Sequence, residues 1–319
     1  MVSLKAEEAD IRPTVLITKP LAKSSIAELE RLFETVSIVG AADVDAVLTE
    51  HGDAIRGIAG GKVSAAMMER LPRLEIIANE GVGVDTTDVP TAKARGIAVT
   101  NTPDVLNVAV AELAVAMMLG LARTLPEADR FVRDGKWGNG MFPLRSQLCG
   151  KTAGIIGLGR IGKEIATRLA AFGMDIAYHG RNEQAGQPYR YYADLTEMAR
   201  ASDWLVVIAP AGKATEGIVS REVIEALGPE GRLVNVARGS LVDQDALIEA
   251  LKSGRLGGAA LDVFATEPDV PAELLSLPNV LLTPHMGSRT HEAREAMGRL
   301  VIDNLVAHFE GRPLPSRVA

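Results

Sequence analysis

Short apolar runs rich in valine and isoleucine alternate along this chain with segments of helical periodicity, in two successive series. The second series has these runs: KTAGIIG (151–157), DIAY (175–178), DWLVVIAP (203–210), GRLVNV (231–236), GAALDVF (258–264) and NVLLTP (279–284). Apolar runs separated by helices are typical of parallel strands that are covered on both faces of a sheet. The second series has as many runs as a full dinucleotide-binding sheet has strands, so the pattern predicts an α/β fold containing a Rossmann domain.

The first series has fewer runs: TVLIT (14–18), VSIV (36–39), IRGIAG (55–60), LEIIAN (74–79) and GIAVT (96–100). Long helices are expected over residues 103–123, between the two series, and over residues 289–310. The first series makes a complete domain only if this last helix joins it, so one domain is predicted to be inserted into the other. The expected parts are a loose tail (1–13), a flavodoxin-like doubly wound substrate-binding domain (14–101 plus 288–319) and a dinucleotide-binding domain (102–287), with the ligand in the cleft between the two domains.

Composition and charge exclude several classes of protein. Hydrophobic residues make up 47% of the chain, which is enough for a core, and the net charge of −7 argues against nucleic acid or an anionic membrane as a partner. No apolar run has transmembrane length, and the N-terminus lacks the apolar stretch of a signal peptide, so a cytoplasmic protein is expected. The one cysteine, Cys149, excludes an intrachain disulfide and is expected to be buried and inert.

A glycine-rich motif follows the first strand of the second series. Gly157, Gly159 and Gly162 fit the pattern GxGxxG, with a strand before them and a helical segment, residues 163–173, after them. The first glycine permits the tight turn, the second lets the backbone approach a pyrophosphate, and the third lets the helix pack on the strand. The N–H groups of Arg160 and Ile161 would then face the phosphates from the helix N-terminus, which predicts a dinucleotide site.

The next strand ends without the acidic residue that usually holds the adenosine ribose of NAD. Gly180 and Arg181 occupy that place, with His179 and Asn182 on either side as further donors. A carboxylate about 4 Å from a 2′-phosphate would cost about 4 kcal/mol at an effective dielectric constant near 20, and Gly180 removes that repulsion. The arginine fork suits a phosphate, so NADPH is the predicted cofactor and NADH the weaker one. The alternative is a solvated Arg181 in an enzyme that accepts both cofactors.

Three chemically useful side chains follow later strands of the second series. Arg238, Glu267 and His285 come after the runs that end near residues 236, 264 and 284, where open α/β sheets place their ligands. Reduction of a 2-oxo acid needs a hydride donor, a proton donor such as histidine, and a cation that polarises the carbonyl. A buried carboxylate beside the histidine would favour its protonated form. Each residue taken alone fits a structural role better, but the three together predict a catalytic set that needs no metal.

With these stretches, and with NTPDVLNVAVAELAV (101–115) and EGVGVD (80–85), nearly the whole chain resembles the D-isomer-specific 2-hydroxyacid dehydrogenases. Within that family it is most similar to the NADPH-dependent glyoxylate and hydroxypyruvate reductases, including the plant hydroxyphenylpyruvate reductases. The resemblance implies that Arg238 binds the substrate carboxylate and carbonyl, that His285 is the acid/base, and that Glu267 pairs with His285.

The resemblance also implies further contacts. Asp262 would meet the nicotinamide carboxamide, with the backbone of Pro210 and Ala237 beside it, and the N–H groups of Val82 and Gly83 would hold the substrate carboxylate. A homodimer through the cofactor domain is implied as well, with an arm near residues 120–150. On that arm Trp137, Met141 and Phe142 would either reach the partner's active site or pack in an ordinary interface.

The predicted function is NADPH-dependent reduction of a small 2-oxo acid, glyoxylate to glycolate or hydroxypyruvate to D-glycerate. An NAD-dependent phosphoglycerate dehydrogenase is less favoured, because the cofactor site suits NADPH and no regulatory domain is expected after Ala319. A dinucleotide-sensing protein, like the transcriptional corepressors that share this fold, is the alternative outside enzymes. The lack of basic or low-complexity extensions counts against it.

Overall fold

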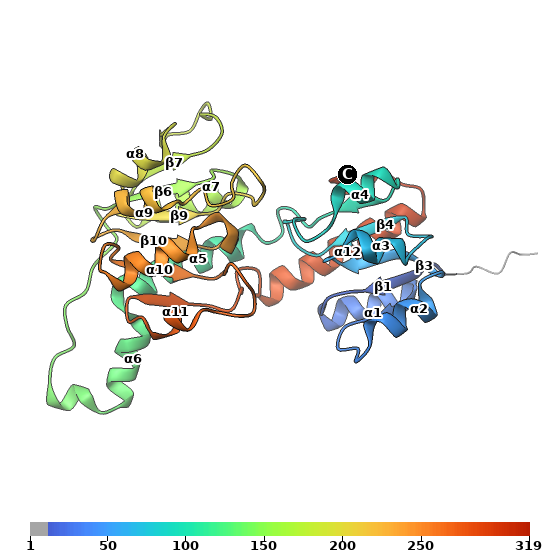
Figure 1. Ribbon diagram of the computed structural model, residues 1–319, viewed down its shortest axis with the longest axis horizontal. Helices are drawn as coiled ribbons and strands as arrows, with labels where there is room; N and C mark the ends of the chain where they lie inside the picture. The colour runs from blue at the N-terminus through green and yellow to red at the C-terminus, as the bar shows by residue number, and fades with distance from the viewer. Residues whose placement is uncertain (1–11) are drawn as a thin grey trace, which may run out of the picture. The chain divides into compact units, whose positions relative to one another are not determined.

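The computed structural model describes residues 12–319, which form two compact units (Figure 1). One unit runs up to Leu106 and resumes over Thr290–Ala319, and the other spans Asn107–Arg289. The sequence had placed these boundaries after residues 101 and 287. Most of the predicted loose tail, residues 1–11, lies outside the described residues.

The first unit is built on a parallel sheet of five strands in the order β2-β1-β3-β4-β5. This is the flavodoxin-like order, as predicted. The strands are β1 (Thr14–Ile17), β2 (Glu34–Ser37), β3 (Ile55–Gly60), β4 (Ile76–Asn79) and β5 (Ala98–Thr100). The helices are α1 (Lys23–Leu32), α2 (Val44–His51), α3 (Ala65–Glu69), α4 (Val89–Ala94) and α12 (His291–Phe309).

Helix α12 belongs to this unit because it completes one face of the sheet. Val301, Ile302 and Leu305 are buried in a cluster with side chains of β1, β3 and β4. The helix also lies close to α1, since a Cβ atom at Gly298 would come within 2.0 Å of Ser25 Oγ. These contacts place the C-terminal helix in the first unit, where the sequence had predicted that it would complete the domain.

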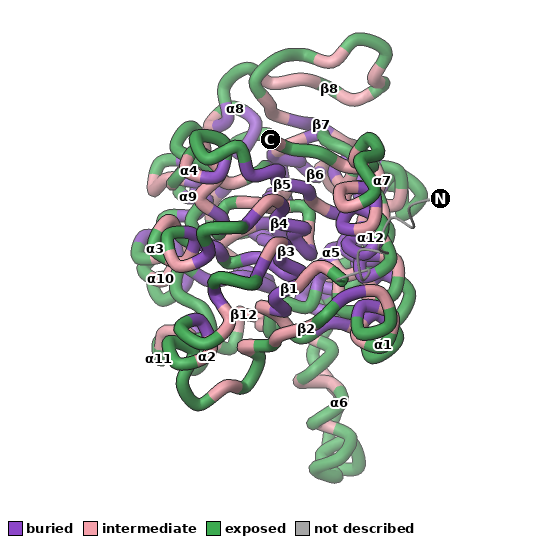
Figure 2. Tube along the Cα trace, turned by 90° about the vertical axis from the view of Figure 1, so that its right-hand side faces the viewer, coloured by how far each residue is buried: buried purple, intermediate pink, exposed green. Residues whose placement is uncertain are grey.

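The second unit contains a parallel sheet of seven strands in the order β12-β11-β10-β9-β6-β7-β8, which is the Rossmann arrangement with one further strand. The strands are β6 (Thr152–Ile156), β7 (Asp175–His179), β8 (Arg190–Tyr191), β9 (Trp204–Val207), β10 (Arg232–Asn235), β11 (Gly258–Leu261) and β12 (Val280–Leu282). Strands β9 and β11 are buried throughout and β10 is buried except at Arg232. In Figure 2 the helices of both units turn exposed surfaces outward. The predicted α/β class with two parallel sheets is confirmed.

One strand of this sheet was not predicted. β8 consists of Arg190 and Tyr191, which pair in parallel with Ala177 and Tyr178 of β7. Two residues that include an arginine give no apolar run, so periodicity could not reveal this edge strand.

The helices of the second unit are α5 (Asn107–Arg123), α6 (Leu125–Arg133), α7 (Arg160–Ala171), α8 (Leu195–Arg200), α9 (Arg221–Leu227), α10 (Gln244–Lys252) and α11 (Ala272–Ser276), with 3-10 turns at Lys136–Asn139 and Gly239–Leu241. Over residues 12–319, no single helix is long and apolar enough to cross a membrane. Helices α5 and α6 meet that test only as a pair bent by 57°. Ten residues of α5 are buried within the protein, as in the core helix of a globular domain.

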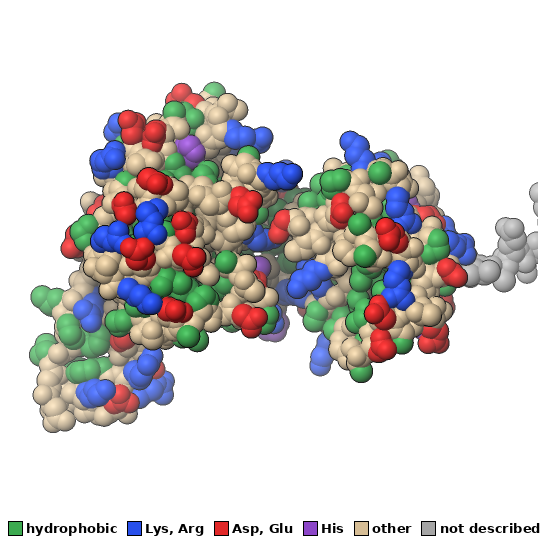
Figure 3. Space-filling view, in the orientation of Figure 1, with side chains coloured by type: hydrophobic (Ala, Val, Ile, Leu, Met, Phe, Trp, Pro, Cys, Tyr) green, Lys and Arg blue, Asp and Glu red, His purple; other side chains and the backbone are tan. Residues whose placement is uncertain are grey.

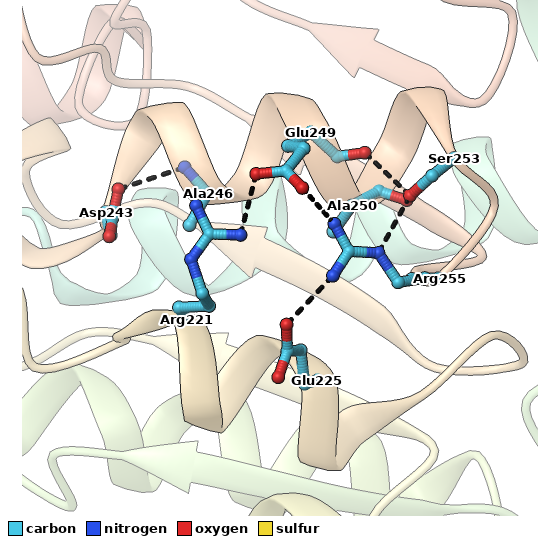
Figure 4. A network of polar contacts seen from close by, with 8 residues as sticks. All are labelled: Arg221, Glu225, Asp243, Ala246, Glu249, Ala250, Ser253 and Arg255. Atoms are coloured by element: carbon cyan, nitrogen blue, oxygen red, sulfur yellow. Dashed lines mark hydrogen bonds and ion pairs between the residues drawn. The ribbon is translucent and has the colours of Figure 1, made fainter.

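An ion-pair network joins α9 to α10 on the surface of this unit (Figure 4). Glu249 accepts hydrogen bonds from Arg221 and from Arg255, and Arg255 also donates to Glu225 at 2.9 Å. The hydrogen bond from Arg221 holds the pKa of Glu249 below its ordinary value. These groups are solvated, so the network orients two surface helices and contributes little to stability. Figure 3 shows acidic and basic side chains interspersed over the visible face.

Candidate active site

The glycine-rich motif forms the turn between β6 and α7. Gly157 has φ +99°, and a Cβ atom there would lie 2.7 Å from Ala209 Cα. A Cβ at Gly162 would lie 2.2 Å from Gly157 O, so the helix start and the turn touch through bare backbone. Gly159 differs, because no atom lies within 4 Å of its Cβ position. Gly159 is also the N-cap of α7 and supplies no side-chain cap to the first helical N–H groups. The turn is therefore closely packed at Gly157 and Gly162, and it has free space at Gly159, where a ligand would approach.

The neighbouring strand β7 ends at His179 and leads into the loop that carries Gly180, Arg181 and Asn182. No atom lies within 4 Å of a Cβ position at Gly180. Arg181 and Asn182 are exposed, and neither has a hydrogen-bond or ion-pair partner within residues 12–319. His179 Nδ1 lies 3.0 Å from Tyr192 O. A carbonyl only accepts, so Nδ1 carries the hydrogen in this contact, and Nε2 is the ring nitrogen left for a ligand.

Arg238 comes directly after β10, in a turn that Asn235 shapes. Asn235 is buried, its Nδ2 donates to Arg238 O at 2.8 Å, and its Oδ1 accepts from Ala237 N at 3.0 Å. Arg238 Nη1 donates to Ala237 O at 2.7 Å. A Cβ at Gly239 would lie 1.9 Å from Phe264 C, so this turn is packed against the segment after β11.

Glu267 and His285 are in direct contact. His285 Nδ1 lies 2.7 Å from Glu267 Oε2, and the other carboxylate oxygen accepts from Phe264 N at 3.1 Å. The side chains of His285 and Glu267 are 47% and 33% exposed, so the expectation of a buried carboxylate is wrong for this structure. The two residues follow β12 and β11, which are neighbours in the sheet and lie next to β10. The carboxyl ends of three adjacent strands thus carry the predicted set.

Asp262 fixes the backbone that carries the histidine. Its carboxylate is buried and accepts from Thr283 Oγ1 at 2.6 Å, Met286 N at 2.8 Å and Gly287 N at 2.9 Å. His285 N donates to Asp262 O at 2.9 Å, and His285 has the uncommon φ of +50°. A left-handed non-glycine residue persists only where its surroundings hold it, and these bonds supply that support. The sequence analysis did not predict this supporting role of Asp262 or of Thr283.

Pro210 lies just after β9, at the same edge of the sheet. Its carbonyl oxygen accepts from Thr215 Oγ1 at 2.8 Å. Ala237, which is buried, uses its carbonyl for the bond from Arg238. Both residues therefore lie at the carboxyl edge of the sheet with backbone oxygens that already accept one bond each.

In the other unit, Val82 and Gly83 lie in the loop after β4. Three successive carbonyls of this loop accept hydrogen bonds, Gly81 O from Thr102 N, Val82 O from Asn101 Nδ2 and Gly83 O from Asn79 Nδ2. In a planar trans peptide, the N–H of one residue points opposite to the carbonyl of the residue before it. The N–H groups of Val82 and Gly83 have no hydrogen-bond partner among the described residues and are held in fixed directions. The sequence did not reveal these three anchors, which come from the end of β4 (Asn79) and from the segment after β5 (Asn101 and Thr102).

Glu80 precedes this loop and is almost fully buried. Its Oε2 lies 3.0 Å from Arg294 Nη1, while its Oε1 is buried without a hydrogen-bond partner in the described chain. Burial raises the pKa of Glu80 above its ordinary value, and the charges of Arg294 and Lys19 offset only part of this effect.

The raised pKa of Glu80 predicts a pH dependence of stability. The folded state binds the proton more tightly than the unfolded chain, whose value is near 4.5. The stabilisation that this proton gives the folded state is therefore complete below pH 4.5. It is lost as the pH rises through the folded-state pKa of Glu80. We expect the difference in unfolding free energy between the native protein and Glu80→Gln to fall as the pH rises from 4.5, in urea titrations. A difference that stays constant or grows up to pH 8 would contradict this, and Glu69→Gln, at an exposed site on α3, is the control.

The arm of the second unit exposes apolar side chains. Trp137 is 67% exposed and Met141 is 88% exposed, and Figure 1 shows α6 projecting from the rest of its unit. Phe142 is partly covered, with its ring centroid 5.3 Å from that of Phe131. Cys149, at the end of this segment, is exposed, so the prediction of a buried cysteine is wrong. Cys149 lies in the turn before β6, and the local apolar pattern did not indicate that this turn is exposed.

Comparisons with known proteins agree with this geometry. Residues 115–287 match the family described as D-isomer specific 2-hydroxyacid dehydrogenase, NAD binding domain. The chain is 46% identical over 303 residues to glyoxylate/hydroxypyruvate reductase A of Arabidopsis thaliana, covering 94% of this chain and 97% of the relative. It is 43% identical to the hydroxyphenylpyruvate reductase of Plectranthus scutellarioides, with the same coverage.

Solved structures show the same likeness. The crystal structure of an NADPH-dependent glyoxylate/hydroxypyruvate reductase from Sinorhizobium meliloti, in complex with NADP and malonate, matches with a TM-score of 0.90 at 45% identity. The match covers 97% of each chain. By its sequence and by its fold, this chain belongs to the D-isomer-specific 2-hydroxyacid dehydrogenase family.

Proposed function

We propose that this protein reduces small 2-oxo acids with NADPH, glyoxylate to glycolate and hydroxypyruvate to D-glycerate. The observation that carries the proposal is the 2.7 Å contact between His285 Nδ1 and Glu267 Oε2, at the sheet edge where Arg238 also lies. An imidazole oriented by a carboxylate is suited to proton transfer at its other nitrogen. The names of the reductases from A. thaliana and S. meliloti support the same reaction.

The second unit is proposed to hold the dinucleotide. Its residues fit the group, because the glycine turn is closed at Gly157 and Gly162 and open above Gly159, and α7 begins there without a side-chain cap. The N–H groups of Arg160 and Ile161 at the helix N-terminus would hold the pyrophosphate. When bound, NADPH supplies the hydride that the carbonyl carbon of the 2-oxo acid accepts. Pro210, Ala237 and Asp262 are assigned to the nicotinamide end by resemblance alone.

The preference for NADPH rests on the loop after β7. Gly180 brings no carboxylate near the ribose, and Arg181 and Asn182 are exposed with no partner among residues 12–319. A guanidinium that is not already paired keeps its fork for a phosphate.

Replacing Arg181 by Ala is therefore expected to raise the Michaelis constant for NADPH by about tenfold or more, the effect of one lost charge-assisted hydrogen bond, while the constant for NADH changes little. Initial rates at varied cofactor concentration measure both constants. Arg200→Ala, which removes a charge at the end of α8 in the same unit, is the control. Equal effects of Arg181→Ala on the two cofactors would show that Arg181 does not recognise the 2′-phosphate.

The substrate carboxylate is assigned to two kinds of donor. In the first unit, the N–H groups of Val82 and Gly83 are directed by the bonds that hold the carbonyls of Gly81 and Val82. In the second unit, Arg238 offers a guanidinium that stays charged throughout the reaction and polarises the carbonyl. With a net charge of −7, the chain must hold an anionic substrate through local donors and not through its overall field.

The proton is assigned to Nε2 of His285. The carboxylate of Glu267 only accepts, so Nδ1 keeps its hydrogen, and Nε2 is the atom that donates to the carbonyl oxygen during reduction and accepts from the hydroxyl in the reverse direction. The charge of Glu267 stabilises the imidazolium. Asp262 contributes by holding the loop in which His285 lies.

A homodimer through the second unit, in the cytoplasm, is proposed as the working form. The exposed apolar side chains of the arm, Trp137 and Met141 above all, favour a partner surface there. The roles of Trp137, Met141 and Phe142 toward a partner's active site stay predictions.

The decisive experiment is a rate measurement with the purified protein. NADPH oxidation is followed at varied glyoxylate, hydroxypyruvate, pyruvate and an aryl 2-oxo acid, and each series is repeated with NADH. We expect turnover with glyoxylate or hydroxypyruvate and a higher kcat/KM with NADPH than with NADH. NADPH binding without oxidation by any of these acids would indicate a dinucleotide sensor.

A further inference from the structure

The loop from Gly180 to Gln184 is held at both ends by hydrogen bonds that the glycine-rich motif and the catalytic set do not require. At its start, Tyr191 Oη donates to Gly180 O at 3.2 Å. At its end, Gln184 N donates to Tyr178 Oη at 2.7 Å, and Gln184 Nε2 donates to Leu158 O at 2.8 Å. Arg181 lies between these two attachments.

The bond at the start fixes the direction of one peptide unit. The carbonyl of Gly180 points toward Tyr191, so the N–H of Arg181 points the opposite way. Tyr191 is itself fixed, because it pairs with Tyr178 in the sheet and their ring centroids lie 5.3 Å apart. Tyr178 is only 1% exposed, so this support belongs to the core of the unit.

The bonds at the end join the loop to the glycine-rich turn. Leu158 lies between Gly157, which forms the tight turn, and Gly159, where the backbone is proposed to approach the pyrophosphate. Gln184 thus ties the segment proposed to recognise the ribose phosphate to the segment proposed to hold the pyrophosphate. A loop fixed before binding loses less conformational freedom when a ligand binds, so more of its contact energy is realised as affinity.

We propose that Tyr191 and Gln184 are positioning residues that set the preference of this chain for a 2′-phosphate, by holding the backbone on which Arg181 is carried. The inference rests on the proposed use of NADPH. It assigns a function to the short edge strand β8, which brings Tyr191 to the loop.

The test compares two nucleotides that differ only in the 2′-phosphate. Calorimetric titration gives the Kd of adenosine 2′,5′-bisphosphate and of adenosine 5′-monophosphate for the native protein, Tyr191→Phe and Gln184→Leu. In each variant we expect the preference for the bisphosphate to fall about threefold to tenfold, the factor for one hydrogen bond. The control is Tyr192→Phe, which removes a hydroxyl that has no hydrogen bond among the described residues, and which is expected to keep the native preference.

The ratio of the two Kd values separates positioning from a general structural role, because a loosened site would weaken both nucleotides equally. A ratio within twofold of the native value in both variants would overturn the inference, as would an equal loss of both affinities. If Gln184→Leu does not fold, Tyr191→Phe decides alone, since it removes a single oxygen atom. A native protein that binds both nucleotides equally would instead remove the proposed use of NADPH, and the inference with it.

Discussion

Replacement of His285 by Ala is expected to lower the turnover of NADPH with glyoxylate by about two orders of magnitude or more, while the Kd of NADPH changes little. The side chain lies at the sheet edge with its Nδ1 2.7 Å from Glu267 Oε2, and its Nε2 is the atom proposed to donate the proton to the carbonyl oxygen. Without it, the developing alkoxide must be protonated by water. Stopped-flow or steady-state rates measure the loss, and fluorescence titration with NADPH measures binding.

Two further variants define the cause of the loss. His291→Ala removes an exposed histidine at the start of α12 and should leave turnover unchanged. Glu267→Gln keeps an oxygen near Nδ1 but removes the charge that stabilises the imidazolium, so its turnover should lie between those of His285→Ala and the native protein. Native turnover in His285→Ala would show that the acid/base is another group.

Much of the candidate site could be predicted because each side chain of the proposed catalytic set follows an apolar run. A strand in a parallel sheet ends at one edge, so Arg238, Glu267 and His285 could be placed together before any coordinates were known. The close approach within the glycine turn is equally local, since it joins Gly157 to Gly162. These features depend on neighbours in sequence or on the order of strands, and both are visible in the pattern of residues.

The supporting contacts could not be predicted because they join residues far apart in the chain. Asp262 binds the backbone of Met286, and Asn101 binds the carbonyl of Val82. β8 has two residues and no apolar run, so neither the strand nor the bond from Tyr191 to Gly180 left a signal. The sequence therefore predicted which groups act, while the side chains that hold those groups in place could be identified only from the folded structure.

Replacing Gly162 or Gly159 of the same motif by alanine is expected to weaken NADPH binding for two different reasons. At Gly162 the new methyl group would lie 2.2 Å from Gly157 O, and neither backbone segment can move without opening the turn. We expect Gly162→Ala to lose about 1–3 kcal/mol or more of unfolding free energy together with NADPH binding. Urea unfolding and calorimetric titration with NADPH measure the two effects.

Gly159→Ala is the matched comparison, because its methyl group would meet no atom within 4 Å. The backbone of Gly159, at φ −80° and ψ −161°, is extended, and alanine adopts it without strain. The unfolding free energy of this variant should stay within about 0.5 kcal/mol of the native value. The methyl group would instead occupy the space through which a pyrophosphate approaches the backbone, so the affinity for NADPH should fall about tenfold or more. Native affinity in Gly159→Ala would mean that the dinucleotide does not lie over this turn. A Gly159→Ala variant that folds stably but does not bind NADPH would indicate that the cofactor lies over this turn. That conclusion would not depend on a measurement of catalysis.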